Sequence, residues 1–397
     1  EISANERNYK DYLMVSEEAV RSGNIEVALA NICLALSVTG FGTNAYALDA
    51  KYRIGQNLNV KEHHDSWLKC TFPLKLSMSD KLYPPAITSV DWSPTGDFVI
   101  ATNCHDREFG LWDIDTKACI RRFAGHKDCV LAAKYLKKSN TIISGSADWK
   151  IKRWDFSTSQ EISTFSDGQA ESISALAVSA DETILLEASS SSKPIDLFNK
   201  KRHAFRLWNL QTNSLIERFF EHSEPLHANG LAISPDGTMA ITAGYDNTVI
   251  LHKLDGKYVD HKILEKSQFL SNAVCFSPDG RFAVWASDND VKVWDIKSKR
   301  ISATLKGHSS IVKCISFHKC GKYLLTGSRD ETIKLWDFSI GSCVKSFDAP
   351  GGDVISLAFS PNCRYAVSGS EQGSISIWEF DWDYETAITT KVEQKNS

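Results

Sequence analysis

No uncharged apolar run in the sequence approaches the ~20 residues that a membrane-spanning helix needs. The start of the sequence lacks a signal-peptide pattern, and no Asn-X-Ser/Thr acceptor occurs anywhere. A strong excess of charge is missing too, because the 397 residues carry a formal net charge of −4 and the isoelectric point is near 6.3. These absences argue against a membrane partner and against a general nucleic-acid binder. We expect a cytoplasmic protein.

Motifs that carry chemistry are also scarce. The sequence holds no glycine-rich phosphate loop and no nucleophile elbow. Its ten cysteines are scattered and mostly lie in apolar runs, so we expect free thiols rather than the disulfide framework of a small secreted domain. The adjacent His63 and His64 have no third ligand nearby, and Cys314, His318 and Cys320 lack a fourth. We therefore expect no enzymatic activity, no cofactor and no metal.

The sequence does contain a repeat, which the stretch from His308 to Asp337 shows most clearly. It reads as three short strands, IVKCISF, YLLTGS and TIKLWD, separated by turn signals. Apolar residues alternate in the first strand and occupy both faces of the third, which indicates antiparallel sheets with a neighbour on each side. Seven copies aligned on the third strand, spaced by 42, 54, 44, 42, 42 and 42 residues, end at Trp112, Trp154, Trp208, His252, Trp294, Trp336 and Trp378.

A period of about 40–45 residues with Gly-His and Trp-Asp dipeptides resembles the WD-repeat family of β-propellers. The dipeptides Gly125-His126 and Trp154-Asp155 carry this resemblance in one copy, and Gly307-His308 and Trp336-Asp337 carry it in another. The resemblance implies an all-β, seven-bladed β-propeller with four strands in each blade.

The seventh copy has no convincing fourth strand after Trp378. Residues 67–76, WLKCTFPLKL, are similar to fourth strands elsewhere, such as CIRRF at 119–123. We expect this early strand to complete the last blade, because the pairing removes an open sheet edge. The predicted propeller then spans residues 67–380, and residues 381–397 are predicted to be a polar tail.

Residues 1–58 lack strand alternation and proline, and they are predicted to form helices over residues 7–22, 25–38 and 44–58. Residues 59–66 are polar and are predicted to be a linker. Because the chain begins at Glu1 rather than Met, we expect a processed chain or a piece of a longer one. The helical pattern resembles one tetratricopeptide repeat, with an unrelated helical hairpin as the alternative, and the small residues that carry this resemblance are Ala19, Gly23, Ala28 and Ala35.

The resemblance to WD repeats also implies a polar tetrad within a blade. A His before the first strand, a Ser or Thr in the second, an Asp in the next turn and the Trp of the third strand satisfy one another's hydrogen bonds. A Ser-His-Asp set could suggest a hydrolase, but these sets repeat with the blade period, so we interpret them as structural. In the fourth copy His252 replaces the Trp. The complete sets are His126, Ser144, Asp148 and Trp154, and His308, Thr326, Asp330 and Trp336.

The turns before the third strands and the loops leading into the first strands should share one face, which we call the rim. Trp149 stands in such a turn where sister copies carry Asn or Glu. A Trp with Tyr and Arg nearby has the composition of an interface hot spot, although Trp149 could instead fold onto its neighbour. The candidate contact residues on the rim are His105, Arg107, Trp149, Tyr245, Arg329 and Glu371.

We predict a non-catalytic protein-protein interaction scaffold whose protein or peptide partner binds the rim. The alternative is the sensory or autoinhibitory C-terminal region of a larger multidomain signalling enzyme, a kinase or a nucleotide-switch protein. Catalytic or helical-repeat domains of the same polypeptide would then be partners. Nucleic acid is the least favoured partner, since only the basic run Lys200–His203 supports it.

Overall fold

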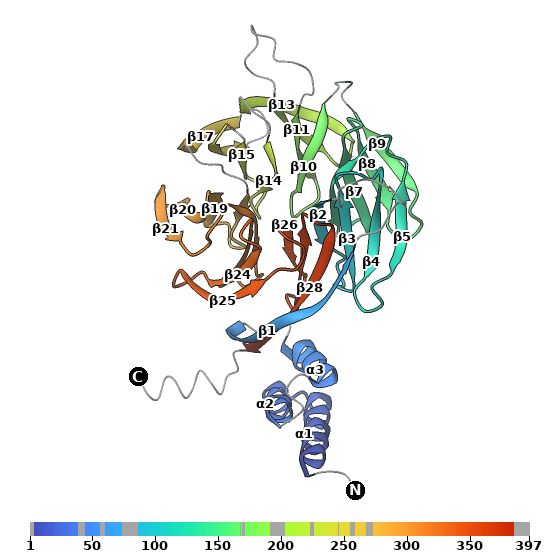
Figure 1. Cartoon of the computed structure of the whole chain (residues 1–397), viewed down its shortest axis with the longest axis vertical. Helices are drawn as coiled ribbons and strands as arrows, with labels where there is room; N and C mark the ends of the chain where they lie inside the picture. The colour runs from blue at the N-terminus through green and yellow to red at the C-terminus, as the bar shows by residue number, and fades with distance from the viewer. Residues whose placement is uncertain are drawn as a thin grey trace. The chain divides into compact units, whose positions relative to one another are not determined.

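The computed structural model of the chain contains a ring of seven four-stranded sheets (Figure 1). It describes residues 4–38, 44–55, 60–73, 86–166, 168, 171–190, 203–222, 226–244, 246–254, 259–266 and 273–384. The sheets are preceded by three helices. The predicted fold class, a seven-bladed β-propeller with a small N-terminal helical segment, is confirmed.

Six blades each use four consecutive strands, numbered outward from the centre of the ring. Blades one to three contain β2 (Ile87–Trp92), β3 (Phe98–Asn103), β4 (Glu108–Asp113) and β5 (Cys119–Ala124); β6 (Val130–Leu136), β7 (Thr141–Ser146), β8 (Ile151–Asp155) and β9 (Glu161–Phe165); and β10 (Ser172–Val178), β11 (Ile184–Ser190), β12 (His203–Asn209) and β13 (Ser214–His222). Blades four to six contain β14 (Leu226–Ile233), β15 (Met239–Gly244), β16 (Thr248–Leu254) and β17 (Val259–Lys266); β18 (Val274–Phe276), β19 (Phe282–Ser287), β20 (Asp290–Asp295) and β21 (Arg300–Leu305); and β22 (Val312–Phe317), β23 (Tyr323–Ser328), β24 (Thr332–Asp337) and β25 (Ser342–Asp348). Blade seven contains β26 (Val354–Phe359), β27 (Tyr365–Ser370), β28 (Ser374–Tyr384) and β1 (Val60–Pro73).

The hydrophobic core lies between neighbouring blades. The second strands β7 and β23 are buried along their whole length, because each has a sheet packed against both of its faces. Between blades one and two, for example, Phe109 and Phe123 of the first blade pack with Ile142 and Trp154 of the second. The first strands of adjacent blades contact one another, and β2 contacts β26, so the ring is closed.

Blade seven is completed by the earliest strand of the chain, because β1 lies at the outer edge of its sheet beside β28. The hydroxyls of Thr71 and Ser376 are 2.9 Å apart across this pair. Phe72 then packs on Trp112 of blade one, with ring centres 5.6 Å apart, and so fills the seam between blades seven and one. Of the strand predicted over residues 67–76, residues 74–76 lie outside the described part.

Two segments that the sequence suggested were irregular are strands in the structure. Residues 60–66 form the first half of β1 rather than a linker, and residues 381–384 form the end of β28 rather than a polar tail. Apolar contact explains the difference. The imidazole of His63 packs on the buried indole of Trp382 with ring centres 5.3 Å apart, and its Nε2 lies 3.0 Å from the hydroxyl of Ser66.

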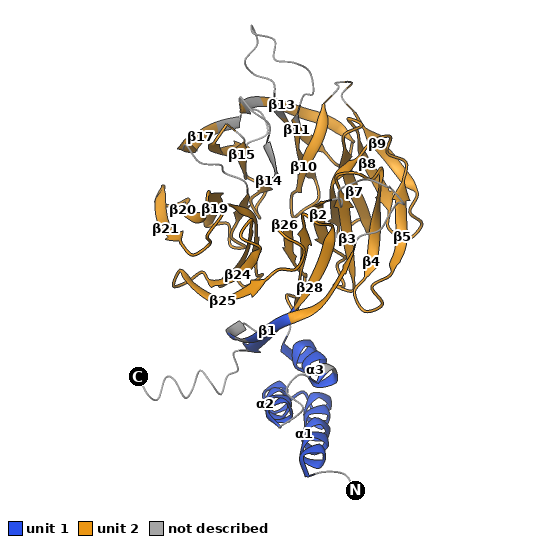
Figure 2. Cartoon of the chain, viewed as in Figure 1, with its two compact units in different colours: residues 1–67, 379–397 blue, residues 68–378 orange. Residues whose placement is uncertain are grey.

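The described part of the chain divides into two compact units (Figure 2). Unit 2 comprises residues 68–378, and unit 1 comprises residues 1–67 and 379–397. Unit 1 holds α1 (Ala4–Arg21), α2 (Ile25–Ser37) and α3 (Ala45–Gly55). The side chain of Asn24 caps α2 by accepting from the amide of Val27 at 3.3 Å. The predicted helices are present, while their resemblance to a tetratricopeptide repeat stays a prediction.

A buried cation ties α3 to the end of β28 within unit 1. The ammonium of Lys51, whose side chain is 5% exposed, lies 2.8 Å from the carboxylate of Asp381 and 3.1 Å from that of Asp383. A buried charge is tolerated only with such partners. Both aspartates lie in the segment that was predicted to be a polar tail.

Replacing Phe72 by Ala should open the seam between blades seven and one. The ring is 6% exposed, so its loss should lower the free energy of unfolding by about 3 kcal/mol. Urea unfolding followed by tryptophan fluorescence measures the change. Leu68→Ala is the matched control on the same strand, because Leu68 is 40% exposed. Equal effects of the two variants would contradict the seam.

Candidate functional site

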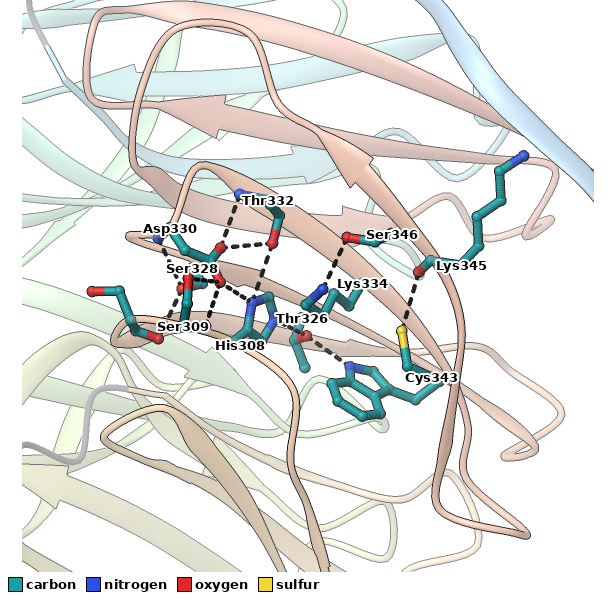
Figure 3. A network of polar contacts seen from close by, with 12 residues as sticks. His308, Ser309, Thr326, Ser328, Asp330, Thr332, Lys334, Cys343, Lys345 and Ser346 are labelled. Carbon is teal, nitrogen blue, oxygen red and sulfur yellow. Dashed lines mark hydrogen bonds and ion pairs between the residues drawn. The ribbon is translucent and has the colours of Figure 1, made fainter.

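A chain of four polar side chains runs through blade six (Figure 3). His308 Nδ1 lies 2.8 Å from Asp330 Oδ2, and His308 Nε2 lies 2.7 Å from Thr326 Oγ1. The indole N–H of Trp336 donates to the same Thr326 oxygen at 2.8 Å. The structure therefore brings all four predicted members of this tetrad together, from the loop before β22, from β23, from the turn after it and from β24.

Blade two repeats this arrangement with a serine. His126 Nδ1 lies 2.9 Å from Asp148 Oδ2, and His126 Nε2 lies 2.8 Å from Ser144 Oγ. Trp154 Nε1 donates to Ser144 Oγ at 2.8 Å. The four members again form one continuous chain of hydrogen-bond contacts.

The Trp of the tetrad determines which atom donates in each hydrogen bond. An indole N–H can only donate, so the hydroxyl oxygen of Ser144 accepts from Trp154 and its hydrogen is directed to His126 Nε2. His126 Nδ1 then carries the proton that is donated to Asp148. Ser144 is completely buried, and both its lone pair and its hydrogen are engaged. The geometry therefore suits cohesion between strands and offers no hydroxyl to a substrate.

The charges of the tetrads are set by burial and by hydrogen bonds. Burial alone would raise the pKa of Asp330, but hydrogen bonds from the Thr332 hydroxyl, the Ser309 amide and His308 lower this pKa to about 2. Burial lowers the pKa of His308, against the opposing effect of Asp330. Burial likewise opposes the shift at Asp148, yet hydrogen bonds led by that from His126 hold the pKa of this carboxyl below its usual value.

Blade four completes the same chain with a second histidine. His222 Nδ1 lies 3.0 Å from Asp246 Oδ1, and its Nε2 lies 2.8 Å from Thr242 Oγ1. His252 Nε2 lies 2.8 Å from that same Thr242 oxygen and so takes the place of the Trp. The hydrogen of Thr242 is directed to His222, so His252 must be the tautomer with its proton on Nε2. Its Nδ1 is buried without a hydrogen-bond partner in the described part of the chain.

Blade three replaces the tetrad by a buried ion network that sequence reasoning missed. Arg206 on β12, 3% exposed, forms ion pairs with Glu171 and Glu187. Glu187 on β11 occupies the position of the tetrad Ser, and it accepts from Trp208 Nε1 at 2.8 Å. The signal was available, because a Glu and an Arg interrupt the apolar runs of these two strands.

A carboxylate also connects blades four and five. Glu265 at the end of β17 forms an ion pair with Lys292 of β20 and accepts from the indole N–H of Trp285. The hydroxyl of Ser287 donates to Glu265 at 3.0 Å. The buried polar side chains of a blade can therefore form either a tetrad or a network around a carboxylate.

Backbone hydrogen bonds hold the rim turns against the loops of the next blade. The amide of Val130 in blade two donates to the carbonyl of Asp106 in blade one at 2.9 Å, and the amide of Val312 in blade six donates to the carbonyl of Asp288 in blade five at 2.9 Å. Of the candidate contact residues, Arg107, Trp149, Arg329 and Glu371 are exposed and His105 is half-buried. Tyr245 and the basic residues Lys200 to Arg202 lie outside the described residues.

Trp149 is the unusual residue on the rim. Its side chain is 48% exposed, and its backbone has a φ of 68°, in the left-handed region. The corresponding turns of blades four and six have Asn247 at 60° and Glu331 at 64°. Positive φ suits Asn but is unfavourable for a bulky side chain. About half of the surface of Trp149 nevertheless remains exposed to solvent.

Blades six and seven carry a group of charged side chains on the rim. Arg329 Nε lies 3.7 Å from Asp353 Oδ2, and the Arg329 side chain is 61% exposed. Burial, and then the neighbouring Glu371 carboxylate, raise the pKa of Asp353. Lys313 and Arg329 act on this pKa in the opposite direction.

The described residues include no group of three or more His, Cys, Asp or Glu side chains that could hold a metal ion. His318 is completely buried, burial lowers its pKa to about 3, and its Nδ1 accepts from the Cys320 amide at 3.1 Å.

None of the described helices combines the length and the apolar character that crossing a membrane requires.

Replacing Thr326 by Val should break the blade-six tetrad with little change in volume. Trp336 and His308 would each lose a buried hydrogen bond, so we expect a loss of about 3 kcal/mol in the free energy of unfolding, measured by urea titration. Ser346→Ala removes an exposed hydroxyl of the same blade and should change this value by less than about 0.5 kcal/mol. A loss for Thr326→Val as small as for this control would refute the tetrad as a stabilising unit.

Acid should destabilise the propeller through His252. Burial, followed by repulsion from His222 and His261, lowers the pKa of His252 well below 6.5. The unfolded chain therefore binds a proton that the folded chain does not, and stability is lost as pH falls below about 6.5. His252→Gln should flatten the dependence of stability on pH between 6.5 and 4.5 by up to about 1.4 kcal/mol per pH unit. Urea titrations at several pH values, with His105→Gln of blade one as control, test this; a slope for His252→Gln that equals those of the wild type and of the control would contradict it.

Comparison with known sequences agrees with the blade pattern. The family WD40, "WD domain, G-beta repeat", matches residues 81–113, 117–155, 213–253, 262–295, 299–337 and 341–379. The unmatched stretch from 156 to 212 includes most of blade three, where the ion network replaces the tetrad.

Several curated proteins are similar to the chain. It is 24% identical over 246 residues to the U3 small nucleolar RNA-associated protein 15 homolog of Gallus gallus, a match covering 62% of this chain and 44% of that protein. It is 26% identical over 214 residues to Autophagy-related protein 16 of Arabidopsis thaliana, covering 53% and 39%. It is 25% identical over 235 residues to Pre-mRNA-processing factor 17 of Homo sapiens, covering 56% and 38%. The chain thus spans less than half of the length of these relatives.

The family matches together cover more than half of the chain, and each spans most or all of the first three strands of one of six blades. Both the sequence and the closed ring of four-stranded sheets therefore lead to one assignment: the chain belongs to the WD40 repeat family.

Proposed function

We propose that the chain is a non-catalytic scaffold that binds a protein or peptide on the rim. The main support for this proposal is the exposure of Trp149. This large apolar residue is 48% exposed, and its backbone has a positive φ. Such a conformation costs about 1–3 kcal/mol, and the exposed half of the residue buries no apolar surface in return. Binding a partner gives this residue a role that stability does not.

The surroundings of Trp149 support a contact surface. The loop that holds Lys127 lies between the turns of blades one and two, because Val130 donates to Asp106 and the amide of Ala147 donates to the carbonyl of Cys129, each at 2.9 Å. Lys127 of this loop and Arg107 of the blade-one turn are both exposed. Trp and Arg are the residues most enriched at the centres of protein interfaces.

Blades six and seven extend the rim with charges of the opposite sign. Asp353 and Glu371 lie close enough for one carboxylate to raise the pKa of the other, and Arg329 sits beside them. A partner with complementary charges would be oriented by these two regions, because electrostatic complementarity determines register more than affinity. We take the rim from blade six through blade two as the surface that binds.

We propose a cytoplasmic location, which suits ten cysteines that are all free thiols. The names of two relatives refer to nucleolar RNA and to pre-mRNA, and those words describe the relatives. The nucleus, a second reducing compartment, is therefore the alternative location.

Replacing Trp149 by Asn should separate binding from folding. Asn tolerates positive φ, so the variant should be as stable as the wild type or up to about 1 kcal/mol more stable, while partners recovered by quantitative affinity capture should fall at least about tenfold. Ile340→Ala is the control, because Ile340 is 74% exposed in a turn between third and fourth strands, at the other end of its blade. Equal recovery by wild type, Trp149→Asn and Ile340→Ala would refute the assignment of the rim.

A further inference from the structure

The turns between the first and second strands of the blades lie at the end of the ring opposite to the rim, because successive strands are antiparallel. We call them the lower turns, and they comprise residues 93–96, 137–140, 179–182, 234–237, 277–280, 318–321 and 360–363. In all seven, the fourth residue has a positive φ, between 50° and 81°.

Blade seven has an unusual residue at this fourth position. Glycine, which adopts a positive φ without strain, occupies it in four blades, at Gly96, Gly237, Gly280 and Gly321. In blade seven the residue is Cys363, with a φ of 60°. A left-handed backbone is unfavourable for a residue that is neither Gly nor Asn. The thiol is therefore placed there at a conformational cost.

A side chain at the fourth position reaches the lower turn of the preceding blade. The carboxylate of Glu182 in blade three accepts from the amides of Lys138 and Ser139 in blade two at 2.6 Å and 3.2 Å. A Cβ atom at Gly96 in blade one would lie 3.4 Å from Cγ of Asn362, the third residue of the blade-seven turn. The fourth residue of one lower turn is thus next to the third residue of the turn before it.

Between blades six and seven, both of these neighbouring positions are cysteines. Cys320 is the third residue of the blade-six turn, and Cys363 is the fourth residue of the blade-seven turn. The amide of Lys319, next to Cys320, donates to Cys363 Sγ at 3.4 Å, and the amide of Lys322 donates to Cys320 Sγ at 3.4 Å. The 3.4 Å contact of the sister seam is close to the Cβ-to-sulfur distance of about 3 Å across a disulfide.

The two thiols differ in their access to solvent. Cys320 is exposed and lines a groove of about 340 Å³ between blades five and six, whereas Cys363 is 3% exposed. Burial raises the pKa of the Cys363 thiol to about 12, and a negative charge on Cys320 acts in the same direction, so the two sulfurs are neighbours. A small molecule can therefore reach Cys320 first, and Cys363 reacts with what becomes attached there.

We propose that Cys320 and Cys363 form a reversible disulfide that joins blade six to blade seven when a small-molecule disulfide, RSSR, becomes abundant. The Cys320 thiolate attacks RSSR, forms a mixed disulfide and expels one RS⁻. The Cys363 thiolate then attacks the Cys320 sulfur and expels the second RS⁻. Two protein thiols are oxidised, their two protons pass to the two RS⁻ groups, and RSSR is reduced to two RSH. This device lies opposite to the rim and does not rest on the function proposed above.

The disulfide strengthens the attachment of the blade that closes the ring. It links two residues that are distant in the sequence and so reduces the conformational entropy of the unfolded chain. We expect the oxidised protein to unfold at a urea concentration about 1 M higher than the reduced protein.

Equilibration of the full 397-residue chain in mixtures of oxidised and reduced glutathione tests the proposal. Partial burial also raises the pKa of Cys320, so little of its thiolate is present at neutral pH and the mixtures must reach equilibrium. Free thiols are then blocked with iodoacetamide, and peptides are identified by mass spectrometry. We expect a peptide pair that joins Cys320 to Cys363 within one chain in most molecules at the most oxidising ratio, and its loss after dithiothreitol.

Cys363→Gly is the decisive variant, because Gly is the residue of four sister turns and suits the positive φ. In this variant Cys320 should stop at the mixed disulfide with glutathione, and oxidation should leave the urea midpoint unchanged. The matched control, Cys343→Ala, removes another exposed thiol of blade six and should keep both the cross-linked peptide and the shift of the midpoint.

Three results would overturn the proposal. One is a wild type without the joined peptides at every glutathione ratio. Another is a cross-link that forms only between separate chains, which non-reducing gel electrophoresis detects. The third is a shift of the urea midpoint on oxidation of Cys363→Gly that equals the shift of the wild type.

Discussion

The pairing of β1 with β28 is the interaction on which the rest of the structure depends. It joins Thr71 and Ser376, which are 305 positions apart in the sequence. Without it, blade seven would expose an unpaired edge, and the seam around Phe72 and Trp112 would be open. Because the ring is closed, the turns of all blades face one common end. A surface that extends from blade six to blade two can exist only on such a ring.

Inside the blades, different polar groups carry out the same task. Three blades use His, a hydroxyl, Asp and a donor at the third strand, and the donor is a Trp in two of them and His252 in the other. Blade three uses two carboxylates around Arg206 instead. In each case a buried polar atom is satisfied by a neighbouring strand, which fixes the strands relative to one another. In these blades the buried histidines, hydroxyls and acids thus hold neighbouring strands together.

The sequence predicted the ring well, because its period, its Trp positions and its missing last strand are all local patterns. It also predicted the members of the blade-two and blade-six tetrads and the substitution at His252. It did not predict that residues 60–66 and 381–384 are strands, since polar residues such as His63 acquire an apolar partner only after Trp382 lies beside them. The network of Glu171, Glu187 and Arg206 depends on contacts across strands, so it cannot be derived from residue spacing alone.

The closing strand also has a consequence for biosynthesis. A ribosome releases β1 long before it makes β28, so an early strand must wait for its partner while six other blades emerge. Contacts of such large sequence separation form late, because the loop that they close carries a large entropy loss. During this interval the nascent chain exposes an unsatisfied edge that can pair with other chains.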